Sequence, residues 1–125
     1  AGEGAMLAIA RALGATAWRG KIALLAHDLT EVGRQISENH RLADDMMRRC
    51  GYEAGAGAEA NRLIDAANSA GALGAKLTGA GGGGAIFALT APESATVVAG
   101  ALRRAGAADV FVLAVERDGL REERA

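Results

Sequence analysis

The sequence predicts a two-layer α+β domain, with a small mixed sheet and helices packed on one face of it. Three observations lead to this fold class. The first 70 residues carry apolar side chains at spacings of three and four, which is the helical period. Two short apolar runs, 75–78 and 85–90, flank a glycine stretch, and a third covers 109–115. A helical pattern separates the last two runs, so this strand–helix–strand unit predicts a right-handed parallel crossover.

Helices account for the first half of the chain. One helical pattern starts almost at the first residue and ends at Gly14, and a second is expected over 16–27. A third is expected over 29–49, because Asp28 followed by Glu31 has the form of a capping box. An apolar stripe at helical spacing runs through the second and third patterns and comprises Trp18, Ile22, Leu25, Leu29, Val32 and Ile36.

Glycine and proline mark the limits of the later elements. The glycine-rich segment 51–58 is expected to be a loop, and the helix after it, at about 59–70, ends at Gly71, which is a natural left-handed cap. Pro92 favours the start of the last helix, which Gly106 ends. The runs between these helices are therefore expected to be strands.

Length and composition limit the classes of function. A chain of 125 residues is expected to form one domain, with a core of Ala, Val, Leu and Ile because only 3% of its residues are aromatic. The formal net charge is −1 and no basic patch stands out, so nucleic acid and anionic membranes are not expected partners. No apolar run reaches the roughly 18–20 residues that span a bilayer.

The single cysteine bears on the cellular compartment, and the first residues bear on the origin of the chain. Cys50 has no partner for an internal disulfide, which fits a cytoplasmic protein. The sequence begins without Met and almost directly with a helical pattern, which suggests a fragment or a chain cut from a longer polypeptide, with a natural short protein as the alternative.

The most informative segment is the glycine stretch 79–84, which reads Gly-Ala-Gly-Gly-Gly-Gly. A backbone without side chains approaches a ligand closely, and consecutive amides can hold an anion, so the stretch is a candidate phosphate site. The alternative is a flexible hairpin connection. Two residues would close a hairpin with less disorder, so six small residues indicate a further demand. The following residues predict a strand, which excludes a P-loop and a dinucleotide fingerprint, since both open a helix.

Two segments resemble motifs of a known family. Residues 71–84, Gly-Ala-Leu-Gly-Ala-Lys-Leu-Thr-Gly-Ala-Gly-Gly-Gly-Gly, resemble the third signature motif of the GHMP kinases. Residues 37–42, Ser-Glu-Asn-His-Arg-Leu, resemble the Asn-rich helix of the mevalonate kinase and bacterial sugar kinase branches. The resemblance covers about 17–115 and implies a ferredoxin-like fold for this domain.

The resemblance also implies a function. In these kinases the domain packs against an N-terminal nucleotide-binding domain, and the active site lies between the two. The whole chain, 1–125, would then be the C-terminal, acceptor-side domain of an ATP-dependent kinase of a sugar or related alcohol. General resemblance favours a sugar or sugar acid over mevalonate. ATP and Mg²⁺ would be bound mainly by the N-terminal domain, whose Gly-Leu-Gly-Ser-Ser loop does not occur in this sequence.

Carried over by position, the family motif indicates the binding residues. The phosphate and substrate site would comprise Thr78, Gly79, Ala80, Gly81, Gly82 and Gly83. Asn39 and His40 would face the acceptor side of the cleft. The family's catalytic Asp and Lys belong to the N-terminal domain, so we assign no catalytic residue and expect little or no kinase activity from this chain alone.

Less specific interpretations stay open for several residues. His40 continues the apolar stripe and is equally well a core-edge histidine when the family is set aside. His27, His40 and Cys50 lack zinc-ligand spacing, and Asp44 and Asp45 are read as a solvated helix face.

The alternative function is a stand-alone ferredoxin-like metabolite-binding or dimerisation module without catalysis. An exposed apolar face would favour the kinase hypothesis and could also produce homodimers in isolation.

Overall fold

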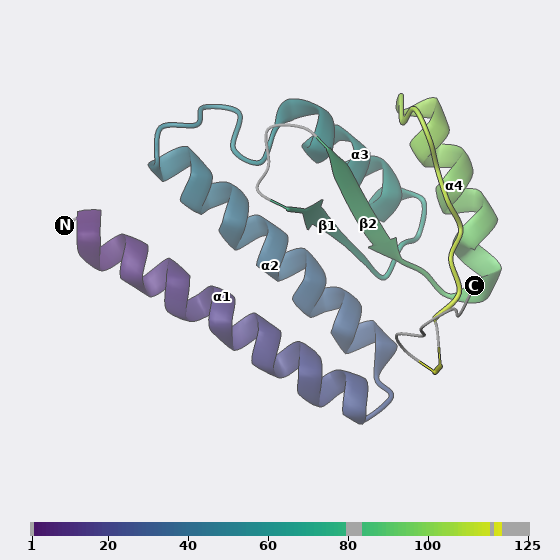
Figure 1. Ribbon diagram of the computed structural model, residues 1–125, viewed down its shortest axis with the longest axis horizontal. Coiled ribbons are helices and arrows are strands. Elements are labelled where there is room, and N and C mark those ends of the chain that lie inside the picture. Colours follow the sequence, from purple (N-terminus) through teal and green to yellow (C-terminus); the bar gives the residue numbers. More distant parts are fainter. Residues whose placement is uncertain (1, 80–83, 116, 119–125) are drawn as a thin grey trace, which may run out of the picture.

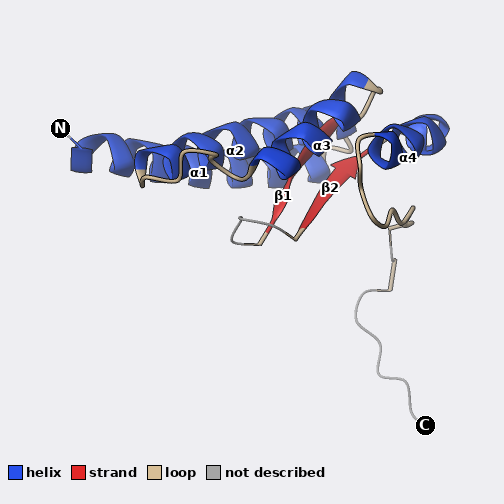
Figure 2. Ribbon diagram, turned by 90° about the horizontal axis from the view of Figure 1, so that it is seen from above, coloured by secondary structure: helices blue, strands red, loops and turns tan. Residues whose placement is uncertain are grey.

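The computed structural model describes residues 2–79, 84–115 and 117–118. Along the chain these residues form α1 (Gly2–Leu25), α2 (Leu29–Arg49), α3 (Ala58–Ser69), β1 (Gly74–Thr78), β2 (Ala85–Leu89), the 3₁₀ turn η1 (Pro92–Ser94) and α4 (Ala95–Arg104) (Figure 1). The α+β class is confirmed. The helices form one layer, and the hairpin of β1 and β2 extends from it (Figure 2).

The sheet positions the glycine stretch at the end of a hairpin. β1 and β2 pair antiparallel, with Leu77 opposite Ile86 and Thr78 opposite Ala85. One face of the hairpin packs on α3 and α4 through a small aliphatic core that comprises Ile64, Ala67, Ala75 and Val98, with Ile86, Ala88 and Leu102 against it. This core of short side chains agrees with the aromatic-poor composition.

The first helix is continuous, so the predicted end at Gly14 is wrong. α1 runs from Gly2 to Leu25 and packs along α2 through a stripe that includes Ile9, Thr16 and Ala23. One glycine inside a helix costs only about 1 kcal/mol relative to alanine. The alanines around it favour the helix, and the packing against α2 offsets the remaining cost.

The other helix limits follow the predicted signals. The Asp28 side chain accepts a hydrogen bond from the Glu31 amide at 2.9 Å and so caps α2. The reciprocal half of the capping box is replaced, since Glu31 accepts from Arg34 and Gln35 at 2.7 Å each. Gly71 has φ +98° after α3, which is the predicted left-handed cap.

The backbones of α2 and β1 approach each other at two glycines. A Cβ atom added to Gly33 would overlap the carbonyl group of Leu73, and one added to Gly74 would overlap the carbonyl group of Gly33. Both glycines are buried. The absence of two side chains therefore sets how closely the helix lies against the strand.

The predicted strand over 109–115 does not form. The prediction of a mixed sheet with a parallel crossover is therefore also wrong for the described residues, whose sheet has the strand order β1-β2. After Gly106 the chain turns back along α4, where Arg103 donates to the Val110 carbonyl at 3.5 Å (Figure 1). A strand needs a neighbour for its N–H and C=O groups, and none lies beside this segment in the described part of the chain. Its apolar side chains are consequently exposed, up to 88% for Val115.

Much of the predicted apolar stripe is also exposed. Trp18, Ile22, Leu25 and Leu29 are exposed, and Trp18 is 62% accessible. These four residues, called the α1 patch below, lie at the C-terminal end of α1 and the start of α2. Among the described helices, none has the length and apolar character needed to cross a membrane.

Candidate functional site

The predicted phosphate site lies at the open end of the hairpin. Thr78 is the last residue of β1, and its hydroxyl donates to the Ala85 carbonyl at 2.9 Å, which closes the mouth of the turn. Gly79 has φ +78° and Gly84 has φ +111°, and both are exposed. Glycine adopts such angles without strain, which explains why glycine stands at both ends of the turn. The predicted residues Ala80, Gly81, Gly82 and Gly83 lie outside the described residues.

His40 connects α2 to β1. Its side chain is buried, with only 8% exposed, and both ring nitrogens have partners. The Leu77 amide donates to Nδ1 at 3.4 Å, and Nε2 lies 2.9 Å from Asn61 Oδ1. The strand residue that His40 contacts, Leu77, directly precedes Thr78, so His40 is close to the predicted site.

Asp44 holds the other end of this hydrogen-bond chain. Its Oδ1 accepts from the Ala56 amide at 2.8 Å and from Asn61 Nδ2 at 2.9 Å, and its Oδ2 accepts from Arg48 Nε at 2.8 Å. Burial raises the pKa of the carboxyl, but the hydrogen bonds from Ala56, Asn61 and Arg48 outweigh it and hold the pKa below its ordinary value. Asp44 is therefore charged at neutral pH.

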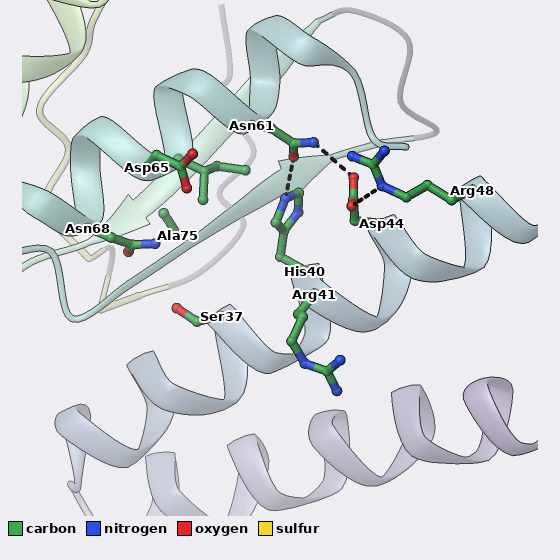
Figure 3. Close-up of a pocket in the computed structure, with 10 residues that line it drawn as sticks. Ser37, His40, Arg41, Asp44, Arg48, Asn61, Asp65, Asn68 and Ala75 are labelled. Carbon is green, nitrogen blue, oxygen red and sulfur yellow. Dashed lines mark hydrogen bonds and ion pairs between the residues drawn. The ribbon is translucent and has the colours of Figure 1, made fainter. Parts of the chain in front are cut away.

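A polar hollow of about 420 Å³ opens between α2 and α3 beside these groups (Figure 3). Its lining comprises Ser37, His40, Arg41, Asp44, Arg48, Asn61, Ile64, Asp65, Asn68 and Ala75. Figure 3 shows His40 and Asn61 pointing towards each other, Asn61 joined in turn to Asp44, and Asp44 to Arg48. The cluster belongs to two helices that are separated in sequence by the loop 50–57.

Asn39 does not share this environment. Its Nδ2 donates to Thr16 Oγ1 at 2.8 Å, so the side chain faces α1. Neighbouring helical residues point about 100° apart, which explains why His40 turns to β1 and Asn39 turns away. The structure thus brings His40, and not Asn39, to the hairpin.

Two residues of the cluster were not identified from the sequence. The prediction that Asp44 lies on a solvated face is wrong, because Asp44 is half-buried and holds the loop before α3. Asp45 fits that assignment better, since it pairs with Arg49 at 3.0 Å. The available signal was the spacing of four that places His40 and Asp44 on one helix face. Asn61 gave no signal, because its two partners lie 21 and 17 residues away.

The described residues hold no group of three or more His, Cys, Asp or Glu that could bind a metal ion. We therefore assign no Mg²⁺ ligand within them.

Comparison with known proteins places the chain in a family. The family model described as GHMP kinases C terminal matches residues 21–108. The chain belongs to the GHMP kinases. The match includes α2, α3, the hairpin and α4, so the hydrogen-bond chain and both flanks of the glycine stretch lie inside the GHMP kinase region.

The similar proteins include mevalonate kinases of Pyrococcus and Thermococcus species. The chain is 41% identical over 98 residues to a mevalonate kinase of Pyrococcus horikoshii, covering 76% of this chain and 26% of that protein. It is 39% identical over 106 residues to one of Thermococcus gammatolerans, covering 80% and 29%, and 52% identical over 61 residues to one of Thermococcus sibiricus, covering 49% and 18%. The chain thus spans less than a third of each of these relatives, and it falls in the mevalonate kinase branch.

Proposed function

We propose that the chain is the C-terminal, acceptor-side domain of an ATP-dependent kinase, and that Thr78 to Gly83 lie at the phosphoryl-transfer site. The observation that carries the proposal is the hairpin turn within the family match. Its flanking glycines have positive φ, its ends are exposed, and the turn is held closed by Thr78 and Ala85.

The chemistry of this proposal is positioning and charge stabilisation. Phosphoryl transfer asks little covalent chemistry of the protein, and fixed donors aimed at the moving phosphoryl group supply much of the catalysis. Removal of one such donor typically costs about 100-fold to 1,000-fold in rate. ATP, with Mg²⁺ bridging its phosphates, would be held mainly by an N-terminal nucleotide-binding domain, which is the partner that we propose for this chain.

The acceptor that we propose is an alcohol of the mevalonate type, and a sugar is the alternative. The similar proteins reported above are all named mevalonate kinases, which favours mevalonate over the sugar acceptor expected from the sequence. A cytoplasmic location follows from the same proposal, because the phosphate donor would be ATP.

Two features support the proposal that this chain is an incomplete domain. In the described residues β2 pairs only with β1, and the apolar segment 109–115 has no sheet partner. The four residues of the α1 patch, which are Trp18, Ile22, Leu25 and Leu29, are exposed. We propose that a longer polypeptide supplies further strands, which would complete a ferredoxin-like sheet, and a domain that covers exposed apolar surface.

The same α1 patch supports one other candidate, a stand-alone module that dimerises or binds a metabolite without catalysis. Sedimentation of the chain over a concentration range separates the two. A dimer that persists in the longer polypeptide without any phosphotransfer would favour the module.

Turnover by the full-length polypeptide that carries this chain tests the kinase. The protein is incubated with ATP, Mg²⁺ and either mevalonate or a panel of sugars, and the products are followed by ³¹P NMR. The proposal expects an alcohol phosphate ester with one acceptor class and no ester without acceptor. Failure of a folded full-length protein to phosphorylate any of these alcohols would exclude it.

A further inference from the structure

We infer that Asp44, Asn61 and His40 form a hydrogen-bonded relay that positions the end of β1 and, with it, the glycine turn. They are positioning residues and do not touch the reacting atoms. The inference rests on the proposed function and adds to it the side chains that hold the turn in place.

The direction of every hydrogen bond in the relay follows from the charge of Asp44. A carboxylate only accepts, so Asn61 turns Nδ2 towards Asp44 and leaves its Oδ1 for His40. That oxygen also only accepts, so the ring proton of His40 lies on Nε2. Nδ1 then carries a lone pair and accepts from the Leu77 amide. The four groups are consistent with one arrangement, in which His40 is the neutral Nε2–H tautomer.

A second connection runs from the same carboxylate to the same strand residue. Asp44 accepts from the Ala56 amide at 2.8 Å, and Ala56 is fully buried in a cluster with Ala60 and Leu77. Leu77 is thus held twice, through its amide by His40 and through its side chain by Ala56. Thr78, the first residue of the predicted site, follows directly in the chain.

The loop around Asp44 is shaped for this contact. Gly55 has φ +60°, and a Cβ atom on it would overlap the Asp44 carboxylate. Arg48 donates to Asp44 at 2.8 Å and to the Glu53 carbonyl at 2.6 Å, which ties the loop back onto α2. Helix, loop and strand therefore meet at one carboxylate.

The energetics favour a positioning role over a stabilising one. A buried polar cluster gives little net stability compared with apolar residues of the same volume, but it admits few alternative arrangements. A displacement of about 1 Å at a reacting group can cost about 100-fold in rate. A polar relay that ends one residue before the predicted phosphoryl site is therefore best explained by the need to fix that site.

The test uses variants of the full-length polypeptide. His40→Phe removes both ring nitrogens and Asn61→Leu interrupts the relay, whereas His40→Gln can still accept from Leu77 and donate to Asn61. Ile9→Ala is the control, because it weakens the packing of α1 on α2, and Ile9 lies outside both the relay and the core around β1. The readouts are hydrogen exchange of a peptide covering 74–79 and the separate values of kcat and KM, corrected for the folded fraction.

We expect His40→Phe and Asn61→Leu to speed exchange in 74–79 by about fivefold, the factor of one lost hydrogen bond. Their kcat should fall by about 10-fold to 100-fold with little change in KM. His40→Gln should recover much of both, and Ile9→Ala should change neither. Unchanged exchange and kcat in His40→Phe, or an equal loss of kcat in Ile9→Ala, would overturn the relay. Absence of turnover in the unsubstituted protein would instead refute the kinase, and the exchange data would still decide the relay.

Discussion

The substitution Gly33→Ala tests how closely α2 lies against β1. The added Cβ would overlap the Leu73 carbonyl and lie 2.7 Å from the Leu73 Cβ. The crossing is reciprocal, because a Cβ on Gly74 would overlap the Gly33 carbonyl and lie 2.8 Å from its Cα. These are mostly backbone atoms, which cannot rotate out of the way as a flexible side chain can. The helix must therefore move off the strand.

The magnitude follows from two opposing effects. Overpacking of a buried site costs about 1–3 kcal/mol, and the upper end applies where backbone meets backbone. The higher helix propensity of alanine returns about 1 kcal/mol. The net loss in the free energy of unfolding should be about 2 kcal/mol, which lowers the ratio of folded to unfolded protein by about 30-fold.

Urea denaturation followed by circular dichroism measures this loss, with Gly20→Ala as the control. Gly20 is also inside a helix, but the nearest atom to its added Cβ is the Gln35 Cβ at an ordinary 3.8 Å. Gly20→Ala should therefore stabilise the protein, by up to about 1 kcal/mol. If the two variants changed stability in the same direction and by the same amount, the close crossing of α2 and β1 would be refuted.

Three further predictions concern the loop, the relay carboxylate and the exposed helix. Gly55→Ala should lower the free energy of unfolding by about 1–3 kcal/mol, because Gly55 has a left-handed backbone. The loss should exceed that of Gly51→Ala, whose added Cβ meets no atom, because a Cβ on Gly55 would overlap the Asp44 carboxylate. Equal losses would show that Asp44 does not fill the space beside Gly55. Because the pKa of Asp44 lies below its ordinary value of 3.8, its stabilisation is complete above that value and disappears as the carboxylate protonates. Wild-type stability should accordingly fall more steeply than that of Asp44→Asn from about pH 5 downward, and parallel curves would contradict this. Trp18, the single tryptophan, should emit as a solvated indole and be quenched by acrylamide in the chain alone; shielding there would show that the α1 patch is covered.

The parts of the fold that the sequence predicted correctly are those set by local chemistry. Asp28 caps α2, Gly71 and Gly106 end their helices with φ near +100°, and the glycine stretch closes a hairpin. Each signal acts within a few residues of itself. The predicted break at Gly14 failed because packing along α2 overrides one weak helix former. The strand over 109–115 failed because an apolar run forms a strand only where a neighbouring strand is present.

In the candidate site too, the sequence predicts only what is set by residues that are near one another in the chain. Thr78 and Gly79 are proposed from the motif, since the residues that define it are contiguous. His40 was identified beside Asn39, but the helical rotation separates the two, and only the structure shows which one faces β1. Asn61 joins partners on another helix, so its role depends on how α3 docks and not on any spacing in the sequence.

The most direct measurement of the central claim compares two glycines in the full-length polypeptide. Gly79 and Gly71 both have positive φ, and a Cβ on either meets no atom within 4 Å, so valine imposes similar backbone strain at each. Gly79 belongs to the proposed phosphoryl site, and Gly71 caps α3 outside it. We predict that Gly79→Val lowers kcat for ATP-dependent phosphorylation by about 100-fold and that Gly71→Val leaves the kcat of the folded fraction within about threefold of the wild type. Equal kcat values for the two variants would contradict a role for the glycine turn in phosphoryl transfer.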